Sequence, residues 1–184
     1  ASWGRTQVWL AGSNGLAGSY VRTGSSLVAS VVAGEGTCME TDYDFSSAVF
    51  AEDLHDPAEI GKSAGEKAVS RLNARKNDTS KLPVVFDPRV ANSMLRHLAG
   101  AISGPSIARG TSFLKDKLNE AVFADGISIV DDPHRARGLR SKPFDAEGLP
   151  NQRRAFIDNG RLTSWVMDLA SSRQLGLKST GNAA

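Results

Sequence analysis

The stretch Val84-Val85-Phe86-Asp87-Pro88 sets the architecture of the second half of the chain. Three apolar, strand-forming residues stand directly before an Asp-Pro pair, in which Asp87 suits a helix N-cap and Pro88 the first helical turn. The pattern therefore predicts a short strand over residues 84–86, followed at once by a helix that extends toward residue 104. Apolar residues at helical spacing predict the buried face of this helix, namely Val90, Met94, Leu98, Ala101 and Ile102.

Between this helix and residue 148, polar loops alternate with one strand. A Ser/Arg/Gly/Thr passage over residues 106–112 leads into a short amphipathic segment that Ser112 is expected to cap. Residues 127–130 predict a second strand, and residues 134–142 form a basic loop. Acidic residues stand on both sides of that loop, so Arg–carboxylate pairs are favoured over phosphate contacts. These acidic residues are Asp131, Asp132, Asp145 and Glu147.

The first third of the chain has the pattern of a β meander. Strands are predicted over residues 6–10, 18–21, 27–32 and 37–43, with turns at Ser13-Asn14-Gly15, Thr23-Gly24 and Gly34-Glu35-Gly36. Glycines at positions 12, 15 and 18 also suggest a phosphate loop, but strand residues follow them instead of a helix, which favours hairpin glycines. Asp56-Pro57 then predicts a helix start, with Ile60, Ala64, Ala68 and Leu72 as the apolar stripe.

The last third is again predicted to be rich in strands. Asp158-Asn159-Gly160 is a strong hairpin signal between strands at 154–157 and 161–167, while residues 169–177 fit either a short helix or a loop. Together the elements predict an α+β fold, with antiparallel β sheets and two main helices packed against them. The polar connector over residues 73–81 is a weak candidate boundary within one fragment, between a meander plus helix (1–72) and residues 82–184.

Composition and charge narrow the function classes only a little. The 184 residues are 40% hydrophobic and 23% charged, which is ordinary for a globular chain. A net charge of +2 is too small to argue for a nucleic-acid or membrane partner, and no apolar run has membrane-spanning length. The single cysteine, Cys38, fits a reducing compartment and is expected to be a buried, inert thiol. Neither end carries a closing element, so the chain is expected to be part of a longer protein.

The residue pattern contains no self-sufficient catalytic or metal site. A zinc-protease helix needs two histidines about a turn apart with a glutamate beside the first, but His55, His97 and His134 are scattered and none has an adjacent Glu. A zinc site formed by distant convergence of these histidines stays open. Asp131-Asp132-Pro133-His134 fits a self-capping turn better than a cation site. No serine lies in a Gly-x-Ser-x-Gly motif. Taken together with the scattered histidines, this means that neither a catalytic residue nor a metal ligand is predicted in this chain.

Seven short motifs, taken in order, resemble one family. They are Val84-Val85-Phe86-Asp87-Pro88, Leu98-Ala99-Gly100-Ala101-Ile102-Ser103-Gly104, Ala108-Arg109-Gly110-Thr111-Ser112-Phe113-Leu114, Val130-Asp131-Asp132-Pro133, Arg137-Gly138-Leu139-Arg140-Ser141, Phe144-Asp145-Ala146-Glu147-Gly148 and Arg173-Gln174-Leu175-Gly176. Their order and number resemble the TldD/PmbA family, whose members are described as modulators of DNA gyrase and as peptidases. Gly34-Glu35-Gly36 and Asp42-Tyr43-Asp44 agree with it, so the resemblance covers nearly the whole chain. It implies an internal fragment, since family members are longer at both ends.

Within this family, the TldD branch carries a His-Glu-x-x-x-His zinc motif on the helix after the first strand. The corresponding helix here, residues 93–101, reads Ser-Met-Leu-Arg-His-Leu-Ala-Gly-Ala and keeps only His97. The chain is therefore similar to the PmbA branch, also called TldE, which lacks these ligands. The resemblance implies a non-catalytic partner of a TldD-like subunit in a cytoplasmic heterodimeric metalloprotease. Its implied substrates are unfolded peptides, including a peptide-antibiotic precursor and an antitoxin.

The same resemblance implies no cofactor in this chain and zinc in the TldD-like partner. Polar residues gathered where the sister branch keeps its metal are candidates for binding substrate or partner: His97, Arg109, Thr111, Ser112, Arg137 and Arg140. Two alternatives stay open. One is a binding protein that acts on DNA gyrase or nucleic acid, which salt-dependent DNA binding would reveal, and the other is an active metallopeptidase with an unusual site.

Overall fold

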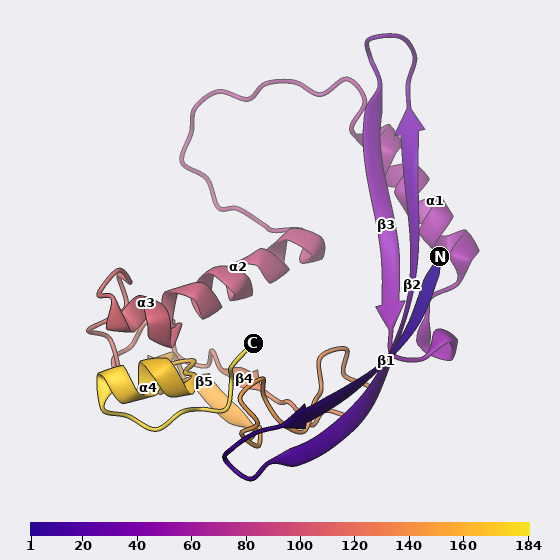
Figure 1. Cartoon of the computed structure of the whole chain (residues 1–184). Helices are drawn as coiled ribbons and strands as arrows, with labels where there is room; N and C mark the ends of the chain where they lie inside the picture. Colours follow the sequence, from indigo (N-terminus) through magenta and orange to yellow (C-terminus); the bar gives the residue numbers. More distant parts are fainter. The chain divides into compact units, whose positions relative to one another are not determined.

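The computed structural model describes all 184 residues and divides them into two compact units. Unit 1 contains residues 1–8, 21–83 and 137–139, and unit 2 contains residues 9–20, 84–136 and 140–184. The strands form two antiparallel three-stranded sheets, which confirms the predicted α+β class (Figure 1). None of the helices combines the length and apolar character that crossing a membrane requires.

The first sheet has the order β1 (Ser2–Ala11), β2 (Ala17–Ala33) and β3 (Glu40–Ala48). Gly15 takes a φ of +86° in the β1–β2 turn, as expected for a hairpin glycine. The predicted turn at Thr23-Gly24 is wrong. β2 runs through it without a positive φ, and the Thr23 hydroxyl donates to the Val49 carbonyl (2.9 Å). Three long strands therefore replace the four short ones that the sequence predicts.

After β3, a short 3-10 helix, η1 (Ala51–Asp53), leads to α1 (Pro57–Ser70), which packs along β3 (Figure 1). The Asp56 carboxylate accepts a hydrogen bond from the Ala58 N–H (2.7 Å), so the predicted cap is present. Ile60, Ala64 and Ala68 are buried, as their spacing predicts. The first helix is therefore specified almost entirely by local sequence.

Charged and hydroxyl side chains complete the contact between α1 and the sheet. Asp44 of β3 accepts hydrogen bonds from the Lys67 ammonium (2.7 Å) and the Ser63 hydroxyl (2.5 Å). Arg71 Nη1 lies 3.4 Å from Asp42 Oδ2, two residues earlier on the same strand face. The bonds from Lys67 and then from Ser63 hold the pKa of Asp44 well below its usual range.

Cys38 lies in the loop between β2 and β3 and is exposed, so the expected buried thiol is wrong. The last β2–β3 residue pair is Ala33 opposite Glu40, and the loop projects past it. No core forms there to cover the sulfur. Sequence context alone could not show this, because burial of a loop residue depends on what packs over the loop.

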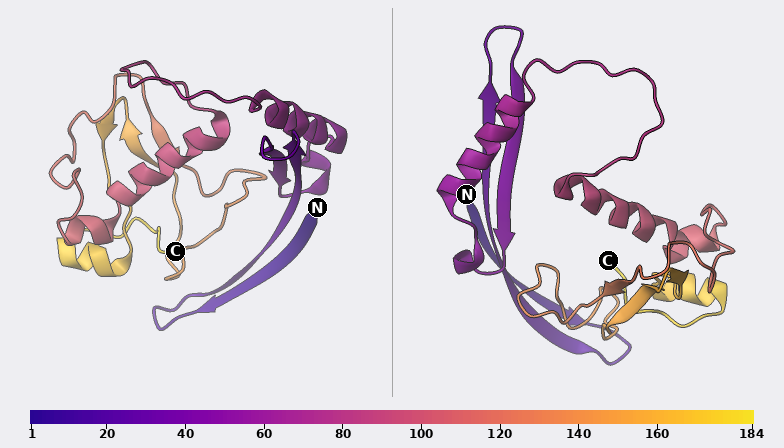
Figure 2. Two further views of the ribbon diagram at one scale, coloured as in Figure 1. Left: turned by 90° about the horizontal axis from the view of Figure 1, so that it is seen from above. Right: turned by 180° about the vertical axis from the view of Figure 1, so that it is seen from behind.

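Unit 2 contains three helices and a second sheet. These are α2 (Pro88–Ala101), α3 (Gly104–Ala108), α4 (Leu169–Leu175), β4 (Ile129–Asp131), β5 (Arg154–Asp158) and β6 (Arg161–Leu162). Asn159 and Gly160 both have positive φ, at 44° and 80°, which confirms the predicted β5–β6 hairpin. β6 stops at Leu162, short of the prediction, because Val166 instead pairs with Ser103 beside α3. Figure 2 shows α3 and α4 side by side, where a Cβ on Gly104 would collide with the Ser171 hydroxyl.

The core of unit 2 gathers where α2 ends. Its buried members are Ile102, Ile107, Leu114, Phe156, Ile157, Leu162, Trp165 and Met167. Only the last turns of α2, through Leu98 and Ala101, pack against this cluster. Val90 is 51% exposed and Met94 46% exposed, so the predicted buried stripe is wrong over the first half of the helix. The short second sheet and α3 meet only the C-terminal end of α2.

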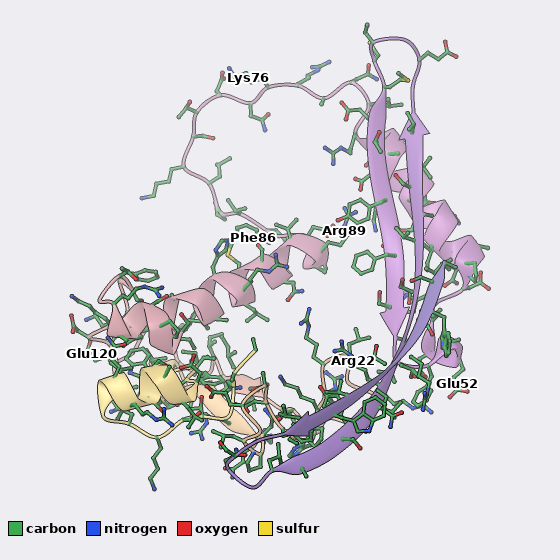
Figure 3. The ribbon with its side chains drawn as sticks, in the orientation of Figure 1. Arg22, Glu52, Lys76, Phe86, Arg89 and Glu120 are labelled. Carbon is green, nitrogen blue, oxygen red and sulfur yellow. The ribbon has the colours of Figure 1, made fainter.

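The predicted strand over residues 84–86 is also wrong. The second sheet contains only β4, β5 and β6, and Val85 is 96% exposed. Strand-forming residues make a strand only where a neighbour completes the ladder of hydrogen bonds, and none does so here. The helix start just after this segment is confirmed, because Asp87 Oδ1 accepts from the Arg89 N–H (2.9 Å). Phe86, which directly precedes that cap, is labelled in Figure 3.

Residues 144–148 form a turn, here called the 144–148 turn, around a buried carboxylate. The Asp145 side chain is only 2% exposed. Its Oδ1 accepts from the N–H groups of Glu147 (3.0 Å) and Leu149 (2.9 Å), and its Oδ2 accepts from the Ala183 N–H (3.0 Å). Three backbone donors therefore satisfy one charge that would otherwise be unstable away from water.

The same turn binds two further segments of unit 2. Glu147 Oε2 accepts from the Leu169 N–H (2.7 Å) at the start of α4. The Glu147 carbonyl accepts from Asn14 Nδ2 (3.3 Å) in the β1–β2 turn. The Phe144 ring meets Tyr20 edge-on, with ring centres 5.3 Å apart. The 144–148 turn thus joins the C-terminal tail, α4 and the hairpin tip.

Asp145→Asn is expected to lower the free energy of unfolding by about 1–3 kcal/mol, because an amide NH2 would face backbone N–H groups that now donate to the carboxylate. Urea denaturation followed by tryptophan fluorescence measures this, since Trp165 lies in the core of the same unit. Asp116→Asn is the matched control, because Asp116 is exposed, and we expect no change beyond about 0.5 kcal/mol. Equal stabilities of Asp145→Asn and wild type would contradict the role given to this carboxylate.

Asp44→Asn is expected to lower the free energy of unfolding by about 1 kcal/mol at pH 7, since the bonds to Lys67 and Ser63 lose their charge assistance in a partly exposed pair. Folding lowers the pKa of Asp44, so its stabilisation is complete above the unfolded-state pKa of about 4 and is lost as pH falls through the folded value. The difference between wild type and variant should therefore shrink from about pH 4 downward, in urea denaturation curves. Glu66→Gln, which alters only the exposed 3.9 Å pair with Lys62, should show neither effect.

Candidate functional site

The six predicted site residues divide between three places. His97 of α2 and the adjacent loop residues Thr111 and Ser112 line one cavity of about 510 Å³ in unit 2. Arg109 is the C-cap of α3 and is exposed just before that loop. Arg140 is exposed elsewhere in unit 2, and Arg137 belongs to unit 1. The structure therefore brings together three of the six residues, and none of the three arginines lines the cavity.

We call this the α2–α3 cavity. The C-terminal half of α2 forms one wall, and Ser106 of α3 with residues 111–114 and 122–123 forms the rest. Local sequence produces this shape, because Gly110, at a φ of +70°, ends the α3 segment and turns the chain back toward α2. The lining residues are Met94, His97, Leu98, Gly100, Ala101, Ser106, Thr111, Ser112, Phe113, Leu114, Val122 and Phe123.

Two of the hydroxyl groups at the cavity, those of Ser112 and Thr111, bond to the backbone, while the Ser106 hydroxyl accepts from the Ser103 hydroxyl (2.9 Å). Ser112 Oγ donates to the Ala101 carbonyl at the end of α2 (2.5 Å) and accepts from the Leu114 N–H (3.0 Å). Thr111 Oγ1 donates to the Ser106 carbonyl (3.3 Å). Ser112 thus caps the loop as predicted and is not poised as a nucleophile, because its proton is held by a carbonyl. What the cavity offers a ligand is mainly apolar surface with the exposed His97 imidazole at its edge.

Arg137 has a structural function within unit 1. It donates to Asp53 Oδ1 (2.5 Å) and Glu52 Oε1 (3.0 Å), and its guanidinium lies 4.8 Å from the centre of the Phe50 ring. The pairs with Glu52 and then Asp53 raise the pKa of Arg137. Figure 3 labels Glu52 on the segment between β3 and α1. Arg–carboxylate pairs therefore anchor the basic loop, as predicted. The carboxylates, however, are those of Glu52 and Asp53, which lie more than 80 residues before Arg137 in the sequence.

The flanking acids predicted to pair with the basic loop bind other groups. Asp132 Oδ1 accepts from the His134 N–H (3.2 Å), which is the self-capping turn that the sequence favours. Asp131 Oδ2 accepts from Asn182 Nδ2 (2.9 Å). Asp132 also lies near Arg153, outside the loop, at 3.8 Å. Sequence proximity therefore gives the wrong partners for these acids, because the loop is anchored by long-range contacts.

The side chains do not fit a zinc site. Nowhere in the chain do three or more His, Cys, Asp or Glu side chains gather closely enough to hold a metal ion. On α2, the positions one and five residues after His97 are Leu98 and Ile102. Counting backward instead places Asn92 and Ser93 where a first histidine and glutamate would stand. Neither register provides the ligand set that a His-Glu-x-x-x-His helix requires.

Two other cavities are lined by none of the predicted site residues. One of about 680 Å³ lies in unit 1, beside Trp3, Leu27, Leu54 and His55. The other, of about 290 Å³, lies between α2 and β4 and is lined mainly by core residues such as Leu98, Ile102 and Phe156. The α2–α3 cavity is therefore the best candidate functional site. Its apolar members Met94, Phe113 and Phe123 were not predicted, since nothing in their sequence spacing links them.

Residues 1–72 match the family description "PmbA/TldA metallopeptidase central domain", and residues 79–184 match "PmbA/TldA metallopeptidase C-terminal domain". Together these matches cover most of the chain with two successive domains of one family. The chain belongs to the PmbA/TldD family.

Individual relatives agree with this assignment. The chain is 41% identical to "Metalloprotease PmbA" of Escherichia coli O157:H7 over 171 residues, which are 93% of this chain and 38% of that protein. It is 39% identical to a PmbA homolog of Haemophilus influenzae, with the same coverage. The chain thus spans well under half the length of the curated relatives that it matches.

Solved structures show the same fold. A proposed modulator of DNA gyrase from Bacteroides thetaiotaomicron superposes with a TM-score of 0.86 at 29% identity, over 94% of this chain and 39% of that one. TldE from Thermococcus kodakarensis superposes with a TM-score of 0.80 at 26% identity, over 92% of this chain and 38% of that one. The arrangement of strands and helices described above is therefore shared with longer PmbA/TldE-type chains.

Ser112→Ala is expected to lower the free energy of unfolding by about 1–2 kcal/mol, because it leaves the Ala101 carbonyl and the Leu114 N–H without their shared partner. Urea denaturation followed by Trp165 fluorescence measures the change. Thr111→Ala is the neighbouring control, since Thr111 is exposed and its 3.3 Å bond is replaceable by water. An unchanged stability in Ser112→Ala would show that the hydroxyl is free for another role.

Proposed function

We propose that this chain is part of the non-catalytic, PmbA/TldE-type subunit of a cytoplasmic protease, whose zinc is carried by a TldD-like partner subunit. The observation that carries the proposal is on α2. The positions that would supply a glutamate and a second histidine after His97 hold Leu98 and Ile102 instead. Ile102 is 2% exposed and Leu98 packs on the same core, so both are committed to apolar packing.

Names of relatives support the family context of this proposal. The relatives from Escherichia coli and Haemophilus influenzae are named metalloproteases. A TldD homolog of Buchnera aphidicola is 29% identical to this chain over 122 residues, so the two branches share sequence over much of the chain. A TldD-like subunit of similar fold is therefore a reasonable partner for a closed heterodimer. Unfolded peptides, including antibiotic precursors and antitoxins, are the proposed substrates.

The proposed binding residues act in different ways. His97, Thr111 and Ser112 would shape the α2–α3 cavity, and Arg109 would stand at its rim. Arg140 is exposed and makes no ion pair, so its charge is available to a substrate or partner. Arg137 is engaged with Glu52 and Asp53, so it would contribute to an interface through the segment that it holds rather than through its own charge. No residue is assigned a catalytic step.

Metal analysis of the full-length protein tests the proposal. We expect no stoichiometric zinc in the protein purified alone, and stoichiometric zinc with peptide cleavage when it is purified together with its TldD-like relative. His97→Ala is the matched variant, and it should leave the zinc content of the pair unchanged because His97 has no second ligand beside it. Stoichiometric zinc in the protein alone would overturn the proposal in favour of an active metallopeptidase. Loss of zinc from the pair on His97→Ala would have the same consequence.

A further inference from the structure

The α2–α3 cavity has the size and lining of a site for an apolar group. Its volume of about 510 Å³ falls within the range of roughly 300–1,000 Å³ typical of ligand sites. Met94 and Phe113 stand at it with 46% and 82% of their surface exposed. The hydroxyls of Thr111 and Ser112 donate to backbone carbonyls, so they do not demand a polar ligand. Filling the cavity with an apolar side chain would remove exposed apolar surface from water on both partners.

Unpaired positive charges flank the cavity on both sides. Arg96 precedes His97 on α2, while Arg109 and Lys115 border residues 111–114 on the other wall. All three are exposed and make no ion pair. The nearby Lys117 is different, because it pairs with Glu120 at 2.7 Å in the segment after α3 (Figure 3). The unpaired acids beside the lining residues are Asp116 and Asp125, so positive side chains outnumber acidic ones there by three to two. The rim therefore carries an excess of positive charge that favours an acidic ligand.

We propose that the α2–α3 cavity is an anchoring subsite for a peptide with a large apolar side chain flanked by acidic residues. The apolar side chain enters between α2 and residues 111–114, and the flanking carboxylates meet Arg96, Arg109 and Lys115. The exposed His97 can donate a hydrogen bond to a peptide carbonyl at the edge. This proposal rests on the proposed function, which makes the ligand a peptide. It adds which peptides bind, namely those with a large apolar residue between acidic residues.

Gly100 provides a variant that fills the cavity without disturbing the fold. It lines the cavity, and a Cβ added there meets no atom within 4 Å. Gly100→Leu places an apolar side chain in the space reserved for the ligand while favouring the helical conformation of α2. Gly100→Ala gives the same helical benefit but leaves most of the space open. The two variants together separate occupation of the cavity from an effect on α2.

The test measures fluorescence anisotropy of a labelled peptide, with one Phe among Asp and Glu residues, on the full-length protein. Replacing the Phe by Ala should weaken binding about tenfold or more, as expected for loss of a buried aromatic side chain. Gly100→Leu should weaken binding of the Phe peptide to a similar extent with an unchanged or raised melting temperature. Gly100→Ala should weaken binding far less than Gly100→Leu does, because a methyl group leaves most of the cavity open. Arg109→Glu combined with Lys115→Glu should weaken the acidic peptide and strengthen a peptide whose acids are replaced by Lys.

Several outcomes would overturn the proposal. Equal binding of the Phe and Ala peptides, or normal binding by Gly100→Leu, would show that the cavity does not take the side chain. Binding of a single-stranded oligonucleotide that depends on Arg109 and Lys115 but not on Gly100 would assign the rim to nucleic acid. A dimer that Gly100→Leu dissociates would assign the cavity to a second copy of the chain. Because no step requires cleavage or metal, the result is independent of the zinc analysis: either proposal can fail while the other stands.

Discussion

The Asp145 carboxylate is the interaction on which the rest of unit 2 depends. A charge that is 2% exposed is tolerable only because three backbone N–H groups point at it, and these come from its own turn and from the distant Ala183. Its neighbour Glu147 then fixes the first residue of α4, and the turn as a whole holds the tip of the β1–β2 hairpin. Segments that share no sheet or helix are thus brought together by one short turn. The core around Ile157 and Trp165 can be small because this polar centre fixes the loops that surround it.

Unit 1 is stabilised differently. The buried residues of α1 are Ile60, Ala64 and Ala68, and Asp44, Lys67 and Ser63 add charge-assisted bonds between this helix and the sheet. The other face of the sheet is open, since Val28 is 59% exposed and Val32 60% exposed. Two of the three buried residues of α1 are alanines, which bury little area, so the charged contacts add to the attachment of this helix. The stability of unit 1 is consequently more sensitive to pH than that of a helix packed on an apolar sheet face.

Features that depend on a few neighbouring residues were predictable from the sequence, and features that depend on distant partners were not. The caps at Asp56 and Asp87 and the turn at Asn159-Gly160 follow from local backbone chemistry, and all three are present. Residues 84–86 have strand-forming side chains but no neighbouring strand, so their β propensity alone predicted a strand that does not form. In the same way, Arg137 finds its carboxylates more than 80 residues away. For the candidate site, the sequence grouped His97, Thr111 and Ser112 with three arginines that do not line the cavity, and the direction of the hydroxyl bonds required the structure.

The two ends of α2 have different physical requirements. Its last turns must be apolar, because Leu98, Ala101 and Ile102 close the core of unit 2. A histidine at position 102 would bury a polar imidazole in this apolar cluster, at a cost of about 1–3 kcal/mol, and a glutamate at position 98 would remove an apolar side chain that packs against it. A metal-binding version of this helix would therefore need a differently packed core, and not only two substitutions. In this chain, the C-terminal half of α2 forms one wall of the α2–α3 cavity. Its C-terminal end is fixed by packing, and the exposed residues Met94 and His97 line the α2–α3 cavity.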